Sequence, residues 1–122
     1  MNRQYSLELL QEAWTNFLQH RGHEVYAPDP PDQVIYVITS HCDGHNSFRW
    51  LLFVAEGQTK RLSPSQMRQL AKEIELAKEQ GQRPFVVVRF TVPKPKILIK
   101  PAHKVLETGQ IGSTRGGIPW FE

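Results

Sequence analysis

The chain has 122 residues, which suffices for one domain with a single core, and its 39% hydrophobic and 22% charged residues are ordinary for a globular protein. No apolar run approaches the roughly 18 residues of a membrane span, and residues 1–6 lack the apolar core of a signal peptide, so we expect a cytoplasmic protein. The single cysteine, Cys42, excludes an internal disulfide framework.

Charge is divided unevenly along the chain. Residues 1–57 hold three Lys/Arg and seven Asp/Glu, net −4, whereas residues 58–122 hold twelve Lys/Arg and five Asp/Glu, net +7. Such a division favours a polyanionic partner and a cluster of metal-binding carboxylates, although two ordinary solvated faces would produce it as well.

The first predicted element is an amphipathic helix that begins after Ser6 as N-cap and ends at Gly22. Its apolar positions recur at helical spacing and form one stripe, which consists of Leu10, Ala13, Trp14, Phe17 and Leu18. A short strand is expected over 23–27, and the prolines that follow end it.

A hairpin is predicted next, with strands over 33–40 and 48–56 joined at Asp43-Gly44. The second strand is almost continuously apolar, which is typical of a strand buried on both faces. If the turn centres on Gly44, the numbers of paired residues sum to about 88. Asp32 and Glu56 would then meet at the open end of the hairpin, within about one residue if a bulge intervenes.

The second predicted helix opens with three start signals: Ser63 as N-cap, Pro64 as first helical residue and Gln66 as the return partner of a capping box. It is expected to stop at Gly81 and to lead into a strand over 85–92. A strand–helix–strand connection is right-handed and parallel, so this strand should lie parallel to 48–56. A further edge strand is expected at 97–99, within a single domain of residues 1–108, followed by a Gly-rich loop or flexible tail over 109–122.

The two carboxylates at the hairpin end are the strongest candidates for chemistry. Adjacent carboxylates repel one another, and a hard cation such as Mg²⁺ relieves that repulsion while taking oxygen ligands. Strand alternation puts Gln58 on the face of Glu56, and Lys60 as well if the strand continues. A turn role for Asp32 and a solvated strand end at Glu56 are the alternatives that need no function.

The element order α-β-β-β-α-β, with Pro31-Asp32 opening the second strand and Glu56-Gly57-Gln58 ending the third, resembles the PD-(D/E)XK (restriction-endonuclease-like) nucleases. The resemblance covers about residues 6–92 and is similar in layout to archaeal Holliday-junction resolvases. It implies an α/β fold with a mixed central sheet flanked by helices. It also implies an Mg²⁺- or Mn²⁺-dependent DNA endonuclease in which Asp32, Glu56 and a first-helix carboxylate, Glu12 or less well Glu8, hold the metal.

The sequence departs from this family at Gln58, where a lysine is usual. An amide can hydrogen-bond but supplies no positive charge. Two hypotheses follow: Lys60 takes over the role of the lysine, so that Asp32, Glu56, Gln58 and Lys60 form the catalytic set, or the domain is a catalytically inactive nucleic-acid-binding or accessory module.

Several lysines and an arginine could contact phosphates, namely Lys60, Arg61, Lys94, Lys96 and Lys100, with Lys104 beyond them. Lysines along an edge strand also prevent aggregation, and that explanation stays open. A transition-metal site at His41-Cys42-Asp43-Gly44-His45 is disfavoured because those residues form a hairpin tip. We expect DNA as partner, no membrane, and a homodimer or a targeting protein contacted through Trp120 and Phe121.

Overall fold

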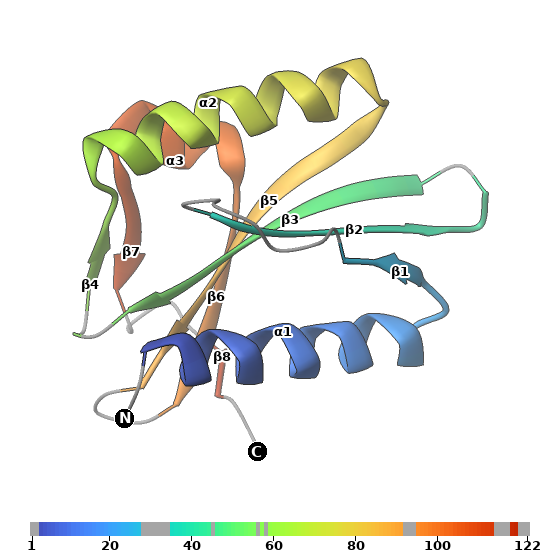
Figure 1. Ribbon diagram of the computed structural model, residues 1–122, viewed down its shortest axis with the longest axis horizontal. Coiled ribbons are helices and arrows are strands. Elements are labelled where there is room, and N and C mark those ends of the chain that lie inside the picture. The colour runs from blue at the N-terminus through green and yellow to red at the C-terminus, as the bar shows by residue number, and fades with distance from the viewer. Residues whose placement is uncertain are drawn as a thin grey trace.

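The computed structural model describes residues 3–27, 35–44, 46–55, 57, 59–91, 95–113 and 118–119. Figure 1 shows three layers, in which a twisted sheet separates α1 from α2 and α3. In the described residues the helices are α1 (Arg3–His20), α2 (Pro64–Glu79) and α3 (Ala102–Thr108). The strands are β1 (Glu24–Tyr26), β2 (Tyr36–Cys42), β3 (Asn46–Ala55), β4 (Thr59–Arg61), β5 (Gln82–Phe90), β6 (Lys96–Pro101), β7 (Gln110–Ser113) and β8 (Ile118–Pro119).

The main sheet has the strand order β1-β2-β3-β5-β6-β8, and β4 pairs with β7 in a separate two-stranded sheet. β3 and β5 are parallel, whereas the other neighbours in the main sheet are antiparallel. The predicted mixed sheet and the parallel crossover through α2 are therefore confirmed.

The hairpin has the predicted register. β2 and β3 pair from Tyr36 with Leu52 to Cys42 with Asn46, so that paired numbers sum to 88. Asp43 and Gly44 both adopt a positive φ, at 55° and 68°, which is why an Asp-Gly pair suits this turn. The continuation of this register toward position 32 falls on residues outside the described part of the chain.

The sheet is buried on both faces. One face packs on α1 through Leu10, Trp14 and Leu18 together with even-numbered residues of β3 such as Leu52 and Val54. The other face packs on α2 and α3 through Leu70, Ala102 and Val105 together with odd-numbered residues such as Leu51 and Phe53. Two apolar faces explain why β3 is an unbroken apolar run from Trp50 to Ala55.

The start of α2 follows its local sequence closely. The hydroxyl of Ser63 accepts a hydrogen bond from the backbone N–H of Gln66, and the amide oxygen of Gln66 accepts one from the backbone N–H of Ser63. Pro64 occupies the first turn, where no donor is needed. The capping box is confirmed, and capping accounts for Gln66 without a role at a site.

Other local expectations were wrong. α1 begins at Arg3 rather than after Ser6, and Phe17, assigned to the buried stripe, is 42% exposed. Helix α3 and strand β4 were not predicted, and residues 110–113 of the expected loop form β7, where Ile111 is fully buried. Short elements such as these depend on their tertiary partners more than on their own periodicity.

No helix in the described residues is long and apolar enough to cross a membrane.

Candidate functional site

One edge of the sheet gathers the ends of four strands. Ala55 at the end of β3 pairs with Phe90 at the end of β5, and Phe90 pairs with Lys96 at the start of β6. Tyr36 begins β2, opposite Leu52. We call this edge, defined by Tyr36, Ala55, Phe90 and Lys96, the carboxyl edge; Figure 1 shows the first turns of α1 lying beside the end of β3. Ligands of α/β proteins tend to bind at such an edge.

The predicted catalytic residues Asp32, Glu56 and Gln58 lie outside the described residues. Glu56 follows Ala55 directly in sequence, and Asp32 precedes Tyr36 by four residues, so both are near, in sequence, to strand ends that lie at the carboxyl edge. Among the residues that the structure does describe, no group of three His, Cys, Asp or Glu side chains could hold a metal ion. The predicted ligand set therefore stays a prediction.

A carboxylate of α1 does approach the carboxyl edge. Burial raises the pKa of the Tyr36 phenol above its ordinary value; its hydrogen bond with Gln11 lowers that pKa, and the negative charge of Glu8 raises it further. Glu8 is thus close enough to the start of β2 to interact electrostatically with Tyr36. Both Glu8 and Glu12 are exposed, one helical turn apart. Neither Tyr36 nor Gln11 had been singled out from the sequence.

Arg89 directly precedes Phe90 of the carboxyl edge and is only 3% exposed. It pairs with Val54 of β3 and with Ile97 of β6, both of which pack on the side of α1, so its side chain belongs to that face. Burial lowers its pKa. Arg89 is the single charged residue in the apolar part of this strand, a feature visible in the sequence, but no role had been assigned to Arg89 from the sequence.

Lys60 was aligned with Glu56 only if the strand continued, and in the described residues Lys60 belongs to a separate strand. β3 ends at Ala55, and Lys60 belongs to β4, where it pairs with Gly112 of β7. A Cβ atom at Gly112 would lie 2.8 Å from the Leu98 side chain and 3.4 Å from Nζ of Lys100. Gly112 therefore lets β7 pack closely on β6 and brings Lys60 and Lys100 to the same neighbourhood.

The predicted phosphate-binding lysines are only partly brought together. Along β6, Lys96, Leu98 and Lys100 point to one face and Ile97 to the other. The two lysines therefore share the face of Leu98, on the side of α2 and α3. Arg61 is exposed in β4, Lys104 is exposed in α3, and Lys94 is outside the described residues.

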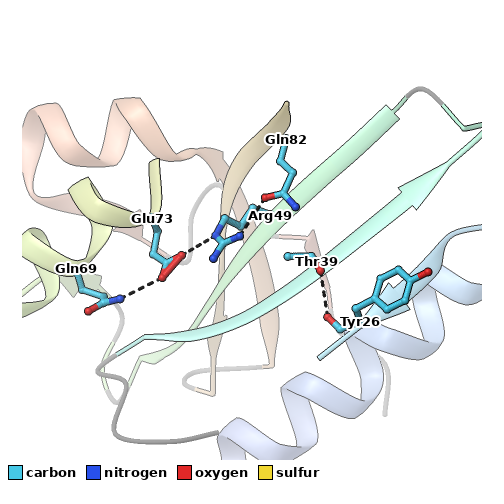
Figure 2. A network of polar contacts seen from close by, with 6 residues as sticks. All are labelled: Tyr26, Thr39, Arg49, Gln69, Glu73 and Gln82. Atoms are coloured by element: carbon cyan, nitrogen blue, oxygen red, sulfur yellow. Dashed lines mark hydrogen bonds and ion pairs between the residues drawn. The ribbon is translucent and has the colours of Figure 1, made fainter. Parts of the chain in front are cut away.

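The hairpin end of the sheet carries a polar network that sequence reasoning missed. Arg49 Nε lies 2.6 Å from Glu73 Oε2, and Arg49 Nη1 donates to Gln82 Oε1 at 3.0 Å (Figure 2). Gln69 donates to the other oxygen of Glu73 at 3.1 Å. Because Glu73 is 2% exposed and comes from α2, the network ties α2 to β3 and β5.

The His-Cys segment of the hairpin tip shows no sign of a transition-metal site in its described residues. His41 Nε2 lies 3.1 Å from Glu24 Oε2, and the His41 ring stacks on Tyr26 at 5.8 Å. Cys42 is a half-buried free thiol.

Comparison with known proteins places the fold. No family model matches the chain, and no curated protein matches it. Among the solved structures that match is Hjc of Archaeoglobus fulgidus, a Holliday junction resolvase from an archaeal hyperthermophile, with a TM-score of 0.60 and 15% sequence identity. The match covers 80% of this chain and 74% of the resolvase. The element order, the mixed sheet and this match together show that the chain has the restriction-endonuclease-like fold of the PD-(D/E)XK nucleases.

Proposed function

We propose that this protein is a metal-dependent DNA endonuclease that cleaves phosphodiester bonds at the carboxyl edge of its sheet. The observation that carries the proposal is the β2–β3 register, in which paired numbers sum to 88. Continued by four residues, that register would set Asp32 opposite Glu56. The fold adds support, because the protein of similar structure is a Holliday junction resolvase.

The donor set fits a hard divalent cation. Asp32 and Glu56 would hold Mg²⁺ or Mn²⁺ through carboxylate oxygens, with Glu12 or Glu8 of α1 assisting. When bound, such an ion lowers the pKa of a water molecule and neutralises charge on the phosphate. Glu8 is the better supported of the two α1 carboxylates, because its charge acts on Tyr36 at the start of β2.

Positive charge for the reaction must come from a residue other than Gln58. The amide of Gln58 would orient the attacking water by hydrogen bonding. We assign the charge to Arg89, which is buried on the α1 face directly before Phe90 of the carboxyl edge. A charge held in a low-dielectric interior acts more strongly on a developing phosphate charge than one in water. Lys60, from β4, would contribute a phosphate contact, as would Arg61, Lys94, Lys96 and Lys100.

The alternative function is a catalytically inactive DNA-binding or accessory module on the same fold. The neutral Gln58 favours it, since the nuclease family usually has lysine there. A cytoplasmic location and a homodimer, or a targeting partner bound through Trp120 and Phe121, belong to both proposals.

Incubation of the purified chain with duplex, single-stranded and branched DNA and Mg²⁺ or Mn²⁺ tests the enzyme. We expect cleavage that disappears with EDTA and in Asp32→Asn and Glu56→Gln, and that increases in Gln58→Lys. Absence of cleavage by both the native chain and Gln58→Lys, with DNA binding retained, would favour the accessory module. Absence of DNA binding would exclude both functions.

A further inference from the structure

A row of aromatic rings crosses the α1 face of the sheet toward its hairpin end. The row consists of Phe17, Trp14, Trp50, Phe48 and Phe85, and we call it the aromatic row. Ring centroids are 4.9 Å apart for Phe17 and Trp14, 5.3 Å for Trp14 and Trp50, and 5.3 and 5.4 Å from Trp50 to Phe48 and Phe85. Each end of the row reaches the surface, since Phe17 is 42% exposed and both phenylalanines of the strands are partly exposed.

The row follows from strand alternation and register. Phe48 and Trp50 are two residues apart on β3, so they share a face. Parallel pairing sets Arg83 beside Phe48 and Phe85 beside Trp50. The remaining rings come from α1, through the edge contact of Trp14 on Trp50 at an interplanar angle of 73°. The pairing of β3 with β5 therefore places Arg83 at the end of the row that Phe48 and Phe85 form.

An exposed arginine covers each end of the aromatic row. Arg21 Cζ lies 4.4 Å from the Phe17 ring centroid, and Arg83 Cζ lies 5.9 and 5.7 Å from those of Phe48 and Phe85. Neither arginine pairs with an acidic residue among those that the structure describes. A guanidinium that packs on a ring uses its flat face and keeps its N–H donors, which point outward in its plane, for another ligand.

We propose that this surface binds an unpaired stretch of a DNA strand, whose phosphates contact Arg21 and Arg83 and whose bases pack against the exposed edges of Phe17, Phe48 and Phe85. The inference rests on the proposed function in taking DNA as the ligand. Guanidinium donors match phosphate oxygens, and the faces of bases are open to contact with aromatic side chains only where the bases are unpaired. A second copy of the chain fits less well, because a two-fold contact of this surface with itself would bring arginines of like charge together.

The surface is separate from the carboxyl edge. Arg83 precedes Phe90 by seven residues of β5, which corresponds to about 23 Å along an extended strand. A stacked DNA strand would span that distance with about seven nucleotides. The proposed binding surface therefore holds DNA beyond the scissile bond and takes no part in the chemistry.

The test is the affinity for a fluorescent oligothymidylate of roughly 20 nucleotides, measured by anisotropy in EDTA so that no cleavage occurs. Arg83→Gln and Phe17→Leu change exposed positions, and Arg68→Gln removes a matched exposed charge from α2 on the opposite face. We expect roughly tenfold weaker binding for each of the first two variants and little change for the third. Equal thermal midpoints would establish that all three variants fold.

Leucine at position 17 separates aromatic contact from plain apolar contact, because it keeps an apolar surface without a ring. Unchanged affinity in both Arg83→Gln and Phe17→Leu would overturn the inference. So would a shift of oligomeric state in these variants, measured by sedimentation, without loss of affinity. If the native chain cleaves duplex DNA with Mg²⁺ but does not bind the oligothymidylate, the inference fails and the proposed function stands. Binding that depends on Arg83, without any metal-dependent cleavage, would support the inference and contradict the proposed function.

Discussion

Two largely buried arginines occupy opposite ends and opposite faces of one sheet. Arg49, with a side chain 13% exposed, lies on the α2 face at the hairpin end and is held by Glu73 and Gln82. Arg89, 3% exposed, lies on the α1 face beside the carboxyl edge, where burial lowers its pKa. Arg49 is paired with a carboxylate from a packed helix, and we expect it to be a structural residue. Arg89 lies beside the edge where the proposed chemistry needs a cation.

The largest expected effect is the loss of the carboxylate of Glu73. Glu73→Ala leaves the largely buried Arg49 charge without its carboxylate partner. This should lower the free energy of unfolding by about 3 kcal/mol. Glu75→Ala on the same helix changes an exposed residue and should alter it by less than about 0.5 kcal/mol. Urea denaturation measures both. Equal effects of the two substitutions would contradict a structural role for the network.

Replacing both partners by apolar residues sharpens the same comparison. Arg49→Met combined with Glu73→Leu removes the two charges together and should restore most of the lost stability, because no buried charge then lacks its partner. The double variant should bind and cleave DNA as the native chain does. Loss of cleavage in a stable double variant would show that the hairpin end also serves the reaction.

Arg89→Met should have the opposite profile. We expect cleavage to fall on the order of 10²-fold, as for the loss of one electrostatic contact in a transition state, with a smaller loss of stability than in Glu73→Ala. Single-turnover cleavage and urea denaturation on the same preparation give the two quantities. Arg89 would be a structural residue like Arg49 if stability fell and cleavage by the folded fraction did not.

The two carboxylates of α1 should differ. Glu8→Gln is expected to reduce metal-dependent cleavage about tenfold, whereas Glu12→Gln should have less effect, because Glu8 acts on Tyr36 at the start of β2. Both residues are exposed on the same helix, so a general loss of folding should affect both variants alike, and a difference between them reports on the site. Raising the Mn²⁺ concentration should rescue Glu8→Gln in part. The reverse ranking would favour Glu12 as the assisting ligand.

The smallest effect concerns alkaline pH. Because the folded state raises the pKa of Tyr36 above 10.0, this residue contributes stability that is complete below pH 10 and is lost as the pH rises through its folded pKa. Tyr36→Phe should therefore flatten the alkaline decline of the free energy of unfolding. The absorbance of ionised tyrosine in this variant should show one fewer group that titrates above pH 10. An unchanged decline would mean that Tyr36 is not shielded by α1.

The parts of the fold with strong local signals were predictable from the sequence. The capping box at Ser63 and the turn at Asp43-Gly44 depend on neighbouring residues alone, and both were confirmed. The turn also fixed the hairpin register, and the apolar run of β3 indicated burial on both faces. By contrast α3 has seven residues and no side-chain cap, and β7, which contains Ile111, pairs only with the three-residue strand β4 in the described residues.

The candidate site was less predictable because its contacts cross between elements. Glu73 lies on the buried stripe of α2 between Leu70 and Ala77, a signal that, taken with Arg49 in an apolar strand, could have indicated the pair. Sequence spacing alone does not show where β3 ends, so the alignment of Lys60 with Glu56 stayed conditional, and Lys60 belongs to β4.

Metal binding tests the central claim most directly, since it needs neither a substrate nor turnover. Calorimetric titration of Mn²⁺ into the native chain should show saturable binding that is lost in Asp32→Asn and in Glu56→Gln and kept in Glu75→Gln. The same Mn²⁺ should raise the thermal midpoint of the native chain but not of the first two variants. Native protein that binds no Mn²⁺, or variants that bind it as tightly, would contradict a metal site at the carboxyl edge.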